Sequence, residues 1–298
     1  MAEQQSVELD ETTWVRPQRS VWRRAYDTWR KKPLGLVGLL MVIILFLAAI
    51  FAEGIAPFTA LEMDAPNRLS GSNSKFILGS DQFGRDMFSR LIFGSRISLT
   101  MGFTVVIIGG VTGLIWGIAS AYIGGYFDLI SQRVADTLQA FPSLILAMAV
   151  VAALGFGIMT TAVAISIPRI DSFNRIVRSQ ALSIASREYI MAAESTGAST
   201  FHILRQHMLP NVMPPWLIIA TAGFGAAIVA EASLSFLGLG VPPPHPSWGG
   251  MLSGNVQQYA ESAPHMIIWP GVFLSFAVFG FNLFGDAVRD VMDPRLRR

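Results

Sequence analysis

The sequence predicts an all-α, polytopic membrane protein with six transmembrane helices, and three observations support this prediction. Of the 298 residues, 52% are hydrophobic and only 14% are charged, whereas about 25% of the residues of an ordinary soluble domain are charged. Apolar runs of about 20 residues match a bilayer core of roughly 30 Å at about 1.5 Å per helical residue. The runs are rich in Gly and Leu and do not alternate strictly, which argues against a transmembrane barrel.

The third and fourth spans are the least clear from hydropathy. The uncharged stretch from Thr137 to Pro168 is long for one span and short for two. If two spans lie there, the basic segments that follow them are on the same side of the membrane as the basic N-terminus. We therefore expect two spans. The fourth helix then runs past Arg169 and Asp171 to the cytoplasmic surface. The expected spans are residues 34–54, 98–122, 138–156, 158–177, 212–236 and 266–288.

Positive charges indicate how the chain is oriented. Seven Lys and Arg residues lie between positions 16 and 32, directly before the first span, so the N-terminus should be cytoplasmic. With six spans the C-terminus is cytoplasmic as well. Residues 57–97 conflict with the preference of positive charge for the cytoplasmic side, because they are external by this count and contain five cations. These are Arg68, Lys75, Arg85, Arg90 and Arg96.

The same pattern divides the chain into four parts. We expect a cytoplasmic segment at 1–33, a first transmembrane helix at 34–56, an external segment at 57–97 and a core domain at 98–298 with the other five spans. A polar stretch at 186–211 interrupts the core and should lie in the cytoplasm.

Residues 80–97 of the external segment predict an interfacial helix that lies along the membrane. Asp86 and Arg90 would pair across one turn of this helix. Its apolar residues recur at four-residue spacing, at Phe83, Met87 and Leu91. The helix either braces the second span or contacts a partner outside the membrane.

Small and polar residues inside the spans are informative. Gly109, Gly113 and Gly117 share one helix face and predict a close contact with another helix. Ionisable residues deep in the spans are nearly absent. Glu231, near the outer end of the fifth span, and Asn282 in the sixth are possible pore or gate residues. Alternatively, Glu231 is simply solvated at the external surface.

Several kinds of chemistry are disfavoured. The chain has no cysteine and no G-x-x-x-x-G-K-[ST] phosphate loop. His202 and His207 are five residues apart, which does not place them on one α-helical face as metal ligands. We therefore expect no catalytic site, no cofactor and no metal on this chain, and no nucleic acid partner. The lack of charge at the membrane midplane also disfavours a carrier driven by an ion gradient.

The stretch EYIMAAESTGASTFHILRQHMLPN at 188–211 predicts a helical hairpin beneath the membrane. Gly197 should end a first helix in the left-handed conformation, and Ser199 or Thr200 should cap a second. We expect Pro210 to close the second helix. Its apolar face would carry Phe201, Leu204 and Met208. The alternative is a solvated amphipathic loop lying on the bilayer.

Four stretches in order resemble one family, the inner-membrane permease subunits of binding-protein-dependent ABC importers, and within it the dipeptide and oligopeptide C-type subunits. They are LGSDQFGRDMFSRLIFGSRISL at 78–99, ADTLQAFPSLILAMAVVAALG at 135–155, the hairpin with its continuation to EASLSFLGLGVPPPHPSWGGML at 231–252, and FNLFGDAVRDVMDPRLR at 281–297. The resemblance runs from about residue 33 to the end. It implies the type I ABC importer permease fold.

The resemblance also implies what the hairpin does. In the proteins it resembles, this element docks on an ATPase subunit and couples ATP-driven closure to the spans. Met191 departs from the family's E-A-A pattern, as His207 departs from its I-x-L-P pattern. The residues implied to form the ATPase-coupling surface are Glu188, Tyr189, Met191, Ala192, Ala193, Gly197 and Ala198.

The implied function is that of a transporter subunit without enzymatic activity of its own. Its partners would be a homologous permease, two ATPase subunits that hold ATP and Mg, an extracytoplasmic solute-binding protein and the lipid of a bacterial inner membrane. The implied solute is a di- or oligopeptide, with nickel complexes or glutathione as alternatives. A stand-alone secondary transporter is the alternative from a different class.

The segment VPPPHPSWGG at 241–250 cannot form a helix and should be extended. We expect it to act either as a strut at the pore mouth or as a docking surface for the binding protein. In either case Trp248 would anchor it at the membrane interface.

Overall fold

The computed structural model describes residues 33–253 and 257–292. The predicted cytoplasmic segment at 1–33 therefore lies almost entirely outside the described residues. The long helices are α2 (Pro33–Ile50), α4 (Met87–Ile123), α5 (Gly125–Gln139), α6 (Ser143–Leu154), α7 (Ile158–Ala185), α10 (Leu209–Phe236) and α11 (His265–Met292). The short elements are α3 (Ala52–Ile55), α8 (Glu188–Ser195), α9 (Thr200–His202), the π-helical turn η3 (Ile203–Met208) and the 3₁₀ turns η2 (Ala65–Asn67), η4 (Gly250–Leu252) and η5 (Gln257–Tyr259).

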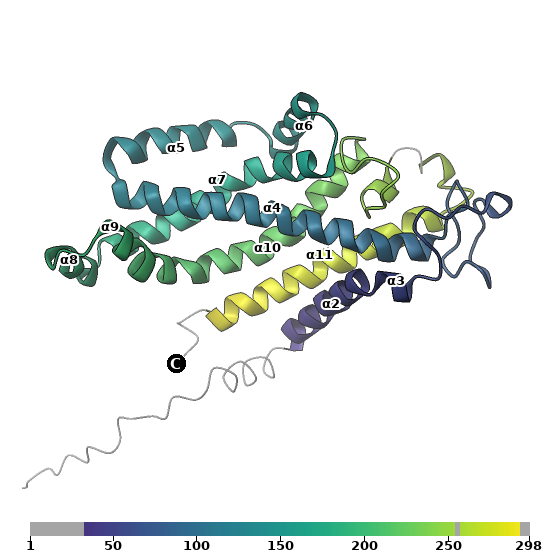
Figure 1. Ribbon diagram of the computed structural model, residues 1–298, viewed down its shortest axis with the longest axis horizontal. Coiled ribbons are helices and arrows are strands. Elements are labelled where there is room, and N and C mark those ends of the chain that lie inside the picture. Colours follow the sequence, from purple (N-terminus) through teal and green to yellow (C-terminus); the bar gives the residue numbers. More distant parts are fainter. Residues whose placement is uncertain (1–32, 254–256, 293–298) are drawn as a thin grey trace, which may run out of the picture.

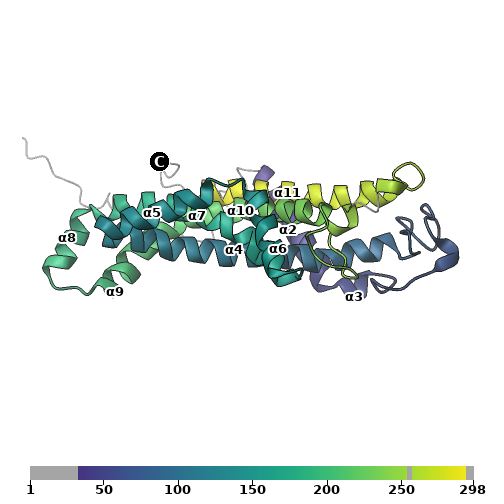
Figure 2. The same ribbon diagram turned by 90° about the horizontal axis from the view of Figure 1, so that it is seen from above.

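Apart from α6, the long helices run side by side along the long axis of the molecule (Figure 1), whereas α6 is turned by 90° from α5. The hairpin that contains α8 and α9 lies at one end, and residues 57–86, 238–253 and 257–264 lie toward the other. Figure 2 shows the same separation of the two ends from a second direction. A polar hairpin and two long loops at opposite ends of a helical bundle are what a membrane protein with two aqueous faces requires.

Within the part of the chain that the structure describes, four helical segments are long and apolar enough to cross a membrane. They are Pro33–Ile50, Met87–Ile123, Thr200–Phe236 and His265–Met292. The α5–α6 pair forms a fifth crossing if it is taken as one span, although it bends by 90°. The helix α7 is long enough but carries several charges, and it extends unbroken past Asp171 to Ala185, as predicted.

The third expected span, 138–156, is wrong, because the structure has two separate helices in this region and not one continuous helix. Helix α5 begins at Gly125 and ends before Pro142, and the separate helix α6 has only 12 residues and covers about 18 Å. Pro142 explains the break, because proline lacks an N–H and disfavours the helical conformation of Phe141 before it. The segment bends at this point.

The interfacial helix expected at 80–97 is also wrong. Residues 80–86 are not helical, and residues 87–97 are the first turns of the continuous helix α4. Asp86 fixes this start, because its carboxylate accepts a hydrogen bond from the N–H of Ser89 at 2.7 Å. Asp86 therefore does not pair with Arg90, and Phe83 lies in the loop before the helix.

The close helix contact predicted at Gly109, Gly113 and Gly117 is confirmed, and the partner is α7. A Cβ atom added at Gly113 would lie 2.5 Å from Cβ of Phe173, and one at Gly117 would lie 2.8 Å from the carbonyl oxygen of Asn174. Only glycine allows the two backbones to approach this closely.

The interface of α5 with α7 contains ion pairs that the sequence pattern did not indicate. Arg175 binds Asp171 at 3.0 Å and Asp136 at 2.9 Å, and Arg178 binds Asp128 at 2.5 Å. Each of these charges on α7 is matched by a carboxylate. These ion pairs hold α5 and α7 together.

Candidate functional site

The hairpin at 186–211 begins with α8 and turns at Gly197. The glycine has φ of +81°, and the N–H groups of Gly197 and Ala198 donate to the carbonyls of Glu194 at 2.9 Å and Ala193 at 3.0 Å. This is the hydrogen-bond pattern of a glycine C-cap, so the predicted role of Gly197 in the turn is confirmed. Ser199 accepts a hydrogen bond from the N–H of His202 at 3.3 Å and begins the second arm.

The second arm differs from the prediction. Its residues 203–208 form a π-helical turn, which adds one residue to the turn. Phe201 is 71% exposed, whereas Met208 is fully buried, so these two side chains do not share one face. The same turn brings the rings of His202 and His207 within 5.8 Å of each other, so these histidines do share one side.

Pro210 does not close the second arm. The chain continues from Thr200 through the π-helical turn to Phe236 as one candidate span. Pro210 lies in the first turn of α10, where a missing N–H is tolerated. The second arm and α10 therefore form one continuous helical segment.

The inner face of the hairpin packs on the ends of three long helices. Ile190, Ile203 and Met208 are buried in one cluster with residues of α4, α7 and α10, among them Ile118 and Val177. Tyr122 at the end of α4 also donates a hydrogen bond to the carboxylate of Glu194 at 3.3 Å. Because this contact is close-packed, the hairpin and the three helices should move together.

The outer face of the hairpin is exposed and partly apolar. Tyr189, Met191 and Phe201 are 44%, 51% and 71% exposed, respectively. Glu188, Ala192 and Gly197 are exposed too, while Ala193 and Ala198 are half-buried against the hairpin's own core. Exposed apolar side chains gathered at one end of a molecule are typical of a protein contact surface.

Glu231 is not solvated at the external surface, so that alternative is wrong, and its role at a pore or gate stays a prediction. Its side chain is fully buried, and its Oε1 accepts hydrogen bonds from Ser235 at 2.7 Å and Ser247 at 2.9 Å. Ser247 belongs to the loop after α10, which folds back over the helix and covers the carboxyl group. Glu231 therefore holds this loop to α10.

Trp248 anchors the same loop within the protein and not at the membrane interface. Its side chain is fully buried, and its indole N–H donates to the carbonyl of Leu91 at 3.0 Å. Its backbone N–H donates to Ser98 at 3.2 Å. Both acceptors are on α4, so the loop joins α10 to α4. This contact supports the interpretation of the loop as a strut.

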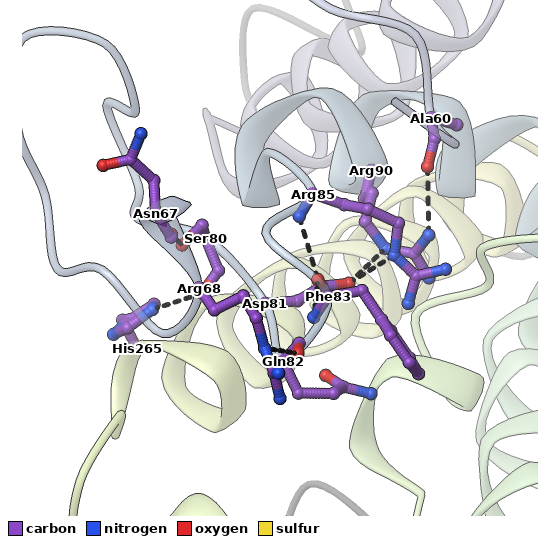
Figure 3. A network of polar contacts seen from close by, with 10 residues as sticks. All are labelled: Ala60, Asn67, Arg68, Ser80, Asp81, Gln82, Phe83, Arg85, Arg90 and His265. Carbon is purple, nitrogen blue, oxygen red and sulfur yellow. Dashed lines mark hydrogen bonds and ion pairs between the residues drawn. The ribbon is translucent and has the colours of Figure 1, made fainter. Parts of the chain in front are cut away.

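Residues 57–86 fold around a buried carboxylate, Asp81, shown in Figure 3. Asp81 binds Arg85 at 2.6 Å and Arg90 at 3.5 Å, and it also accepts the N–H of Phe83 at 2.8 Å. His265, at the start of α11, contacts the carbonyl of Ser80 at 3.0 Å. The network therefore connects the segment to both α4 and α11.

Each of the five cations at 57–97 has a partner, which explains how this segment carries them. Arg96 binds Glu53 at 3.0 Å and Arg68 donates to the carbonyl of Gln82 at 2.7 Å. Lys75 binds Asp64 at 2.5 Å, and hydrogen bonds from Lys75 and Asn67 hold the pKa of Asp64 below its usual value. These charges stabilise the local fold and are poor evidence about orientation.

Asn282 lines a groove of about 430 Å³ between α6, α7, α10 and α11. The walls are mostly apolar, and Arg169 of α7 lines the same groove. The sequence pattern singled out Asn282 but treated Arg169 only as part of the path to the cytoplasm. A cation within an otherwise uncharged stretch was the available signal.

The family model described as "Binding-protein-dependent transport system inner membrane component" matches residues 109–298. This chain belongs to that family. A second model, "N-terminal TM domain of oligopeptide transport permease C", matches residues 20–72. The two matches confirm the predicted resemblance, and the chain is a multi-pass inner-membrane permease subunit and not the ATPase of such a transporter.

Two curated relatives of this inner membrane component match nearly its whole length. It is 39% identical over 288 residues to the dipeptide transport system permease protein DppC of Alkalihalophilus pseudofirmus, covering 97% of this chain and 93% of the relative. It is also 39% identical over 280 residues to the glutathione transport system permease protein GsiD of Escherichia coli, covering 94% and 92% of the two chains.

A solved structure shares the fold of the permease. A chain of the MetNI methionine ABC transporter in an inward-facing conformation aligns with a TM-score of 0.57 and 21% identity. The alignment covers 69% of this chain and 97% of that chain. The likeness shows that the helices are arranged as in an ABC importer permease.

Proposed function

We propose that the chain forms half of the translocation pathway of an ATP-driven importer for di- or oligopeptides. The single observation that carries the peptide assignment is the 39% identity to a dipeptide permease over 97% of the chain. The equal identity to a glutathione permease favours glutathione as a second candidate, and glutathione is itself a small peptide.

The proposed topology has six spans, formed by α2, α4, α5 with α6, α7, α10 and α11. Both termini are cytoplasmic, on the side of the hairpin at 186–211. The separation of this hairpin from residues 57–86, 238–253 and 257–264 supports that topology. The partners are a homologous permease, two ATPase subunits that hold ATP and Mg, and an extracytoplasmic binding protein.

The hairpin is the surface that an ATPase subunit contacts and moves. Its contact residues are Glu188, Tyr189, Met191, Ala192, Ala193, Gly197 and Ala198, to which the structure adds the exposed Phe201. When ATP draws the ATPase pair together, the hairpin moves as a rigid body, because its inner face is packed on α4, α7 and α10. These helices then reorient around the pathway, which includes the groove lined by Asn282.

The test compares two arginine substitutions at glycines that both have positive φ. Gly197 has φ of +81° and Gly155 has φ of +89°, and neither has a heavy atom near the position of a Cβ. Gly155 lies in the connection between α6 and α7, outside the hairpin.

In vesicles with the complete transporter, Gly197→Arg should leave insertion intact but reduce ATP-driven uptake by at least about tenfold, because the side chain blocks close docking. Gly155→Arg should transport almost normally. Unchanged uptake by Gly197→Arg would rule out the coupling role. Uptake that needs only an ion gradient and no ATPase subunit would instead support a secondary transporter.

A further inference from the structure

Arg169 lines the groove between α6, α7, α10 and α11, and no residue that the structure describes forms a hydrogen bond or an ion pair with its side chain. We propose that Arg169 binds the carboxylate of the transported peptide as the peptide crosses the membrane. The proposal rests on the proposed function and extends it by naming the group of the solute that the permease contacts.

The arginines of α7 differ in their partners. Arg175 and Arg178 each bind at least one aspartate. Arg169 forms no hydrogen bond or ion pair with any residue that the structure describes. It is half-buried among apolar neighbours. Because a charge in such surroundings is costly without an anion, the site is incomplete until one binds.

The depth of Arg169 disfavours a lipid phosphate as that anion. Eleven residues separate it from Ile158, the first residue of α7, which is about 17 Å along the helix. In the proposed topology this distance places its Cα near the middle of a bilayer core of about 30 Å. A solute in the pathway passes this depth, whereas lipid headgroups remain at the surface.

The chemistry of the groove suits one end of a peptide. The guanidinium group of arginine presents paired N–H donors that match a carboxylate. Asn282 adds a neutral polar group to the same groove, and Ala147, Val229 and Val278 form apolar walls. A mostly apolar groove with a few polar groups is typical of a site for a small solute. Dipeptides and glutathione both carry the required carboxylate.

The experiment uses the complete transporter in proteoliposomes and two probes, Ala-Phe and its C-terminal amide, each at a concentration that saturates the binding protein. The quantity measured is the ratio of acid uptake to amide uptake. The binding protein is the same in every sample, so a change in this ratio between permease variants reports on the permease alone.

We expect Arg169→Met to lower uptake of the acid at least about fivefold and uptake of the amide much less, since it removes a charge-assisted hydrogen bond. Arg169→Lys should keep most of the preference for the acid, and Arg169→Gln gives the same test as Arg169→Met if the latter does not insert. The control is Arg289→Met, which removes an exposed cation at the end of α11 and should leave the ratio unchanged.

A parallel fall in uptake of both probes would overturn the proposal and show that Arg169 has a structural role or binds an acid of the partner permease. If the unmodified transporter takes up neither Ala-Phe nor glutathione, the proposed peptide function itself fails, and this proposal fails with it. The two failures are distinguishable because the second appears before any substitution is made.

Discussion

At the residue scale, the contact between α4 and α7 depends on the absence of side chains. The three glycines at 109, 113 and 117 face the backbone of α7, and the carbonyl oxygen of Ile170 lies 2.7 Å from where a Cβ of Gly113 would be. Neither helix can yield at this point, because a backbone atom and not the end of a flexible side chain is in the way. The contact is therefore sensitive to a single added group.

We predict that Gly113→Leu destabilises the permease by about 1–3 kcal/mol or more, because it forces the two helices apart. The measurement is the thermal midpoint of unfolding in detergent, followed by size-exclusion chromatography. Gly271→Ala on α11 is the control, because no heavy atom lies within 4 Å of its added Cβ. Equal midpoints for the two variants would contradict the close contact.

At the scale of elements, the segment between α3 and α4 is held by a buried charge network. Asp81 is 3% exposed, and both Arg85 and Arg90 are 7% exposed. Removing a carboxylate that pairs with two buried guanidinium groups lowers the stability of the fold considerably, because both cations would remain buried without it. The network, with the contact from His265, determines how the segment sits on α4 and α11.

We predict that Asp81→Asn destabilises this segment by about 3–5 kcal/mol, the usual cost of breaking a buried ion pair from one side. Limited proteolysis of residues 57–86 should show faster cleavage. Asp64→Asn, which affects an exposed pair with Lys75, should leave the cleavage rate nearly unchanged. If both variants are cleaved at the same rate, the network does not hold the segment.

At the scale of the whole molecule, the two ends of the bundle are different surfaces. The hairpin presents exposed apolar side chains at one end, and the other end carries the Asp81 network and the loop that Glu231 and Trp248 hold down. The long helices connect the ends. Force applied to the hairpin can therefore reach the groove through α7 and α10, which contribute to both.

We predict that single cysteines introduced at Gly71 and Phe156 react with a membrane-impermeant maleimide added outside intact cells, and that cysteines at Tyr126 and Ser195 do not. The unmodified chain has no cysteine, so each label reports one position. Permeabilised cells provide the control, since all four sites should then react. Labelling of Tyr126 from outside, or protection of Phe156, would contradict six spans.

Part of this architecture was predictable because it depends on local properties. Apolar runs specify helices that need lipid, Gly197 specifies a left-handed turn, and a repeat of glycine every four residues specifies a close contact. The π-helical turn at 203–208 and the start of α4 at Asp86 were not predictable. Each of them depends on which neighbours compete for the same backbone groups, and a single sequence does not contain that information.

The sequence by itself determined that this protein is a helical membrane permease with a polar hairpin, since composition, periodicity and motif order do not depend on packing. Only the tertiary structure decided that Glu231 holds a loop, that Trp248 binds α4, and that the cations at 57–97 are paired. It also decided that Arg169 has no hydrogen-bond or ion-pair partner among residues 33–253 and 257–292. The physical reason is that burial and pairing are properties of residues far apart in the chain, and folding alone brings them together.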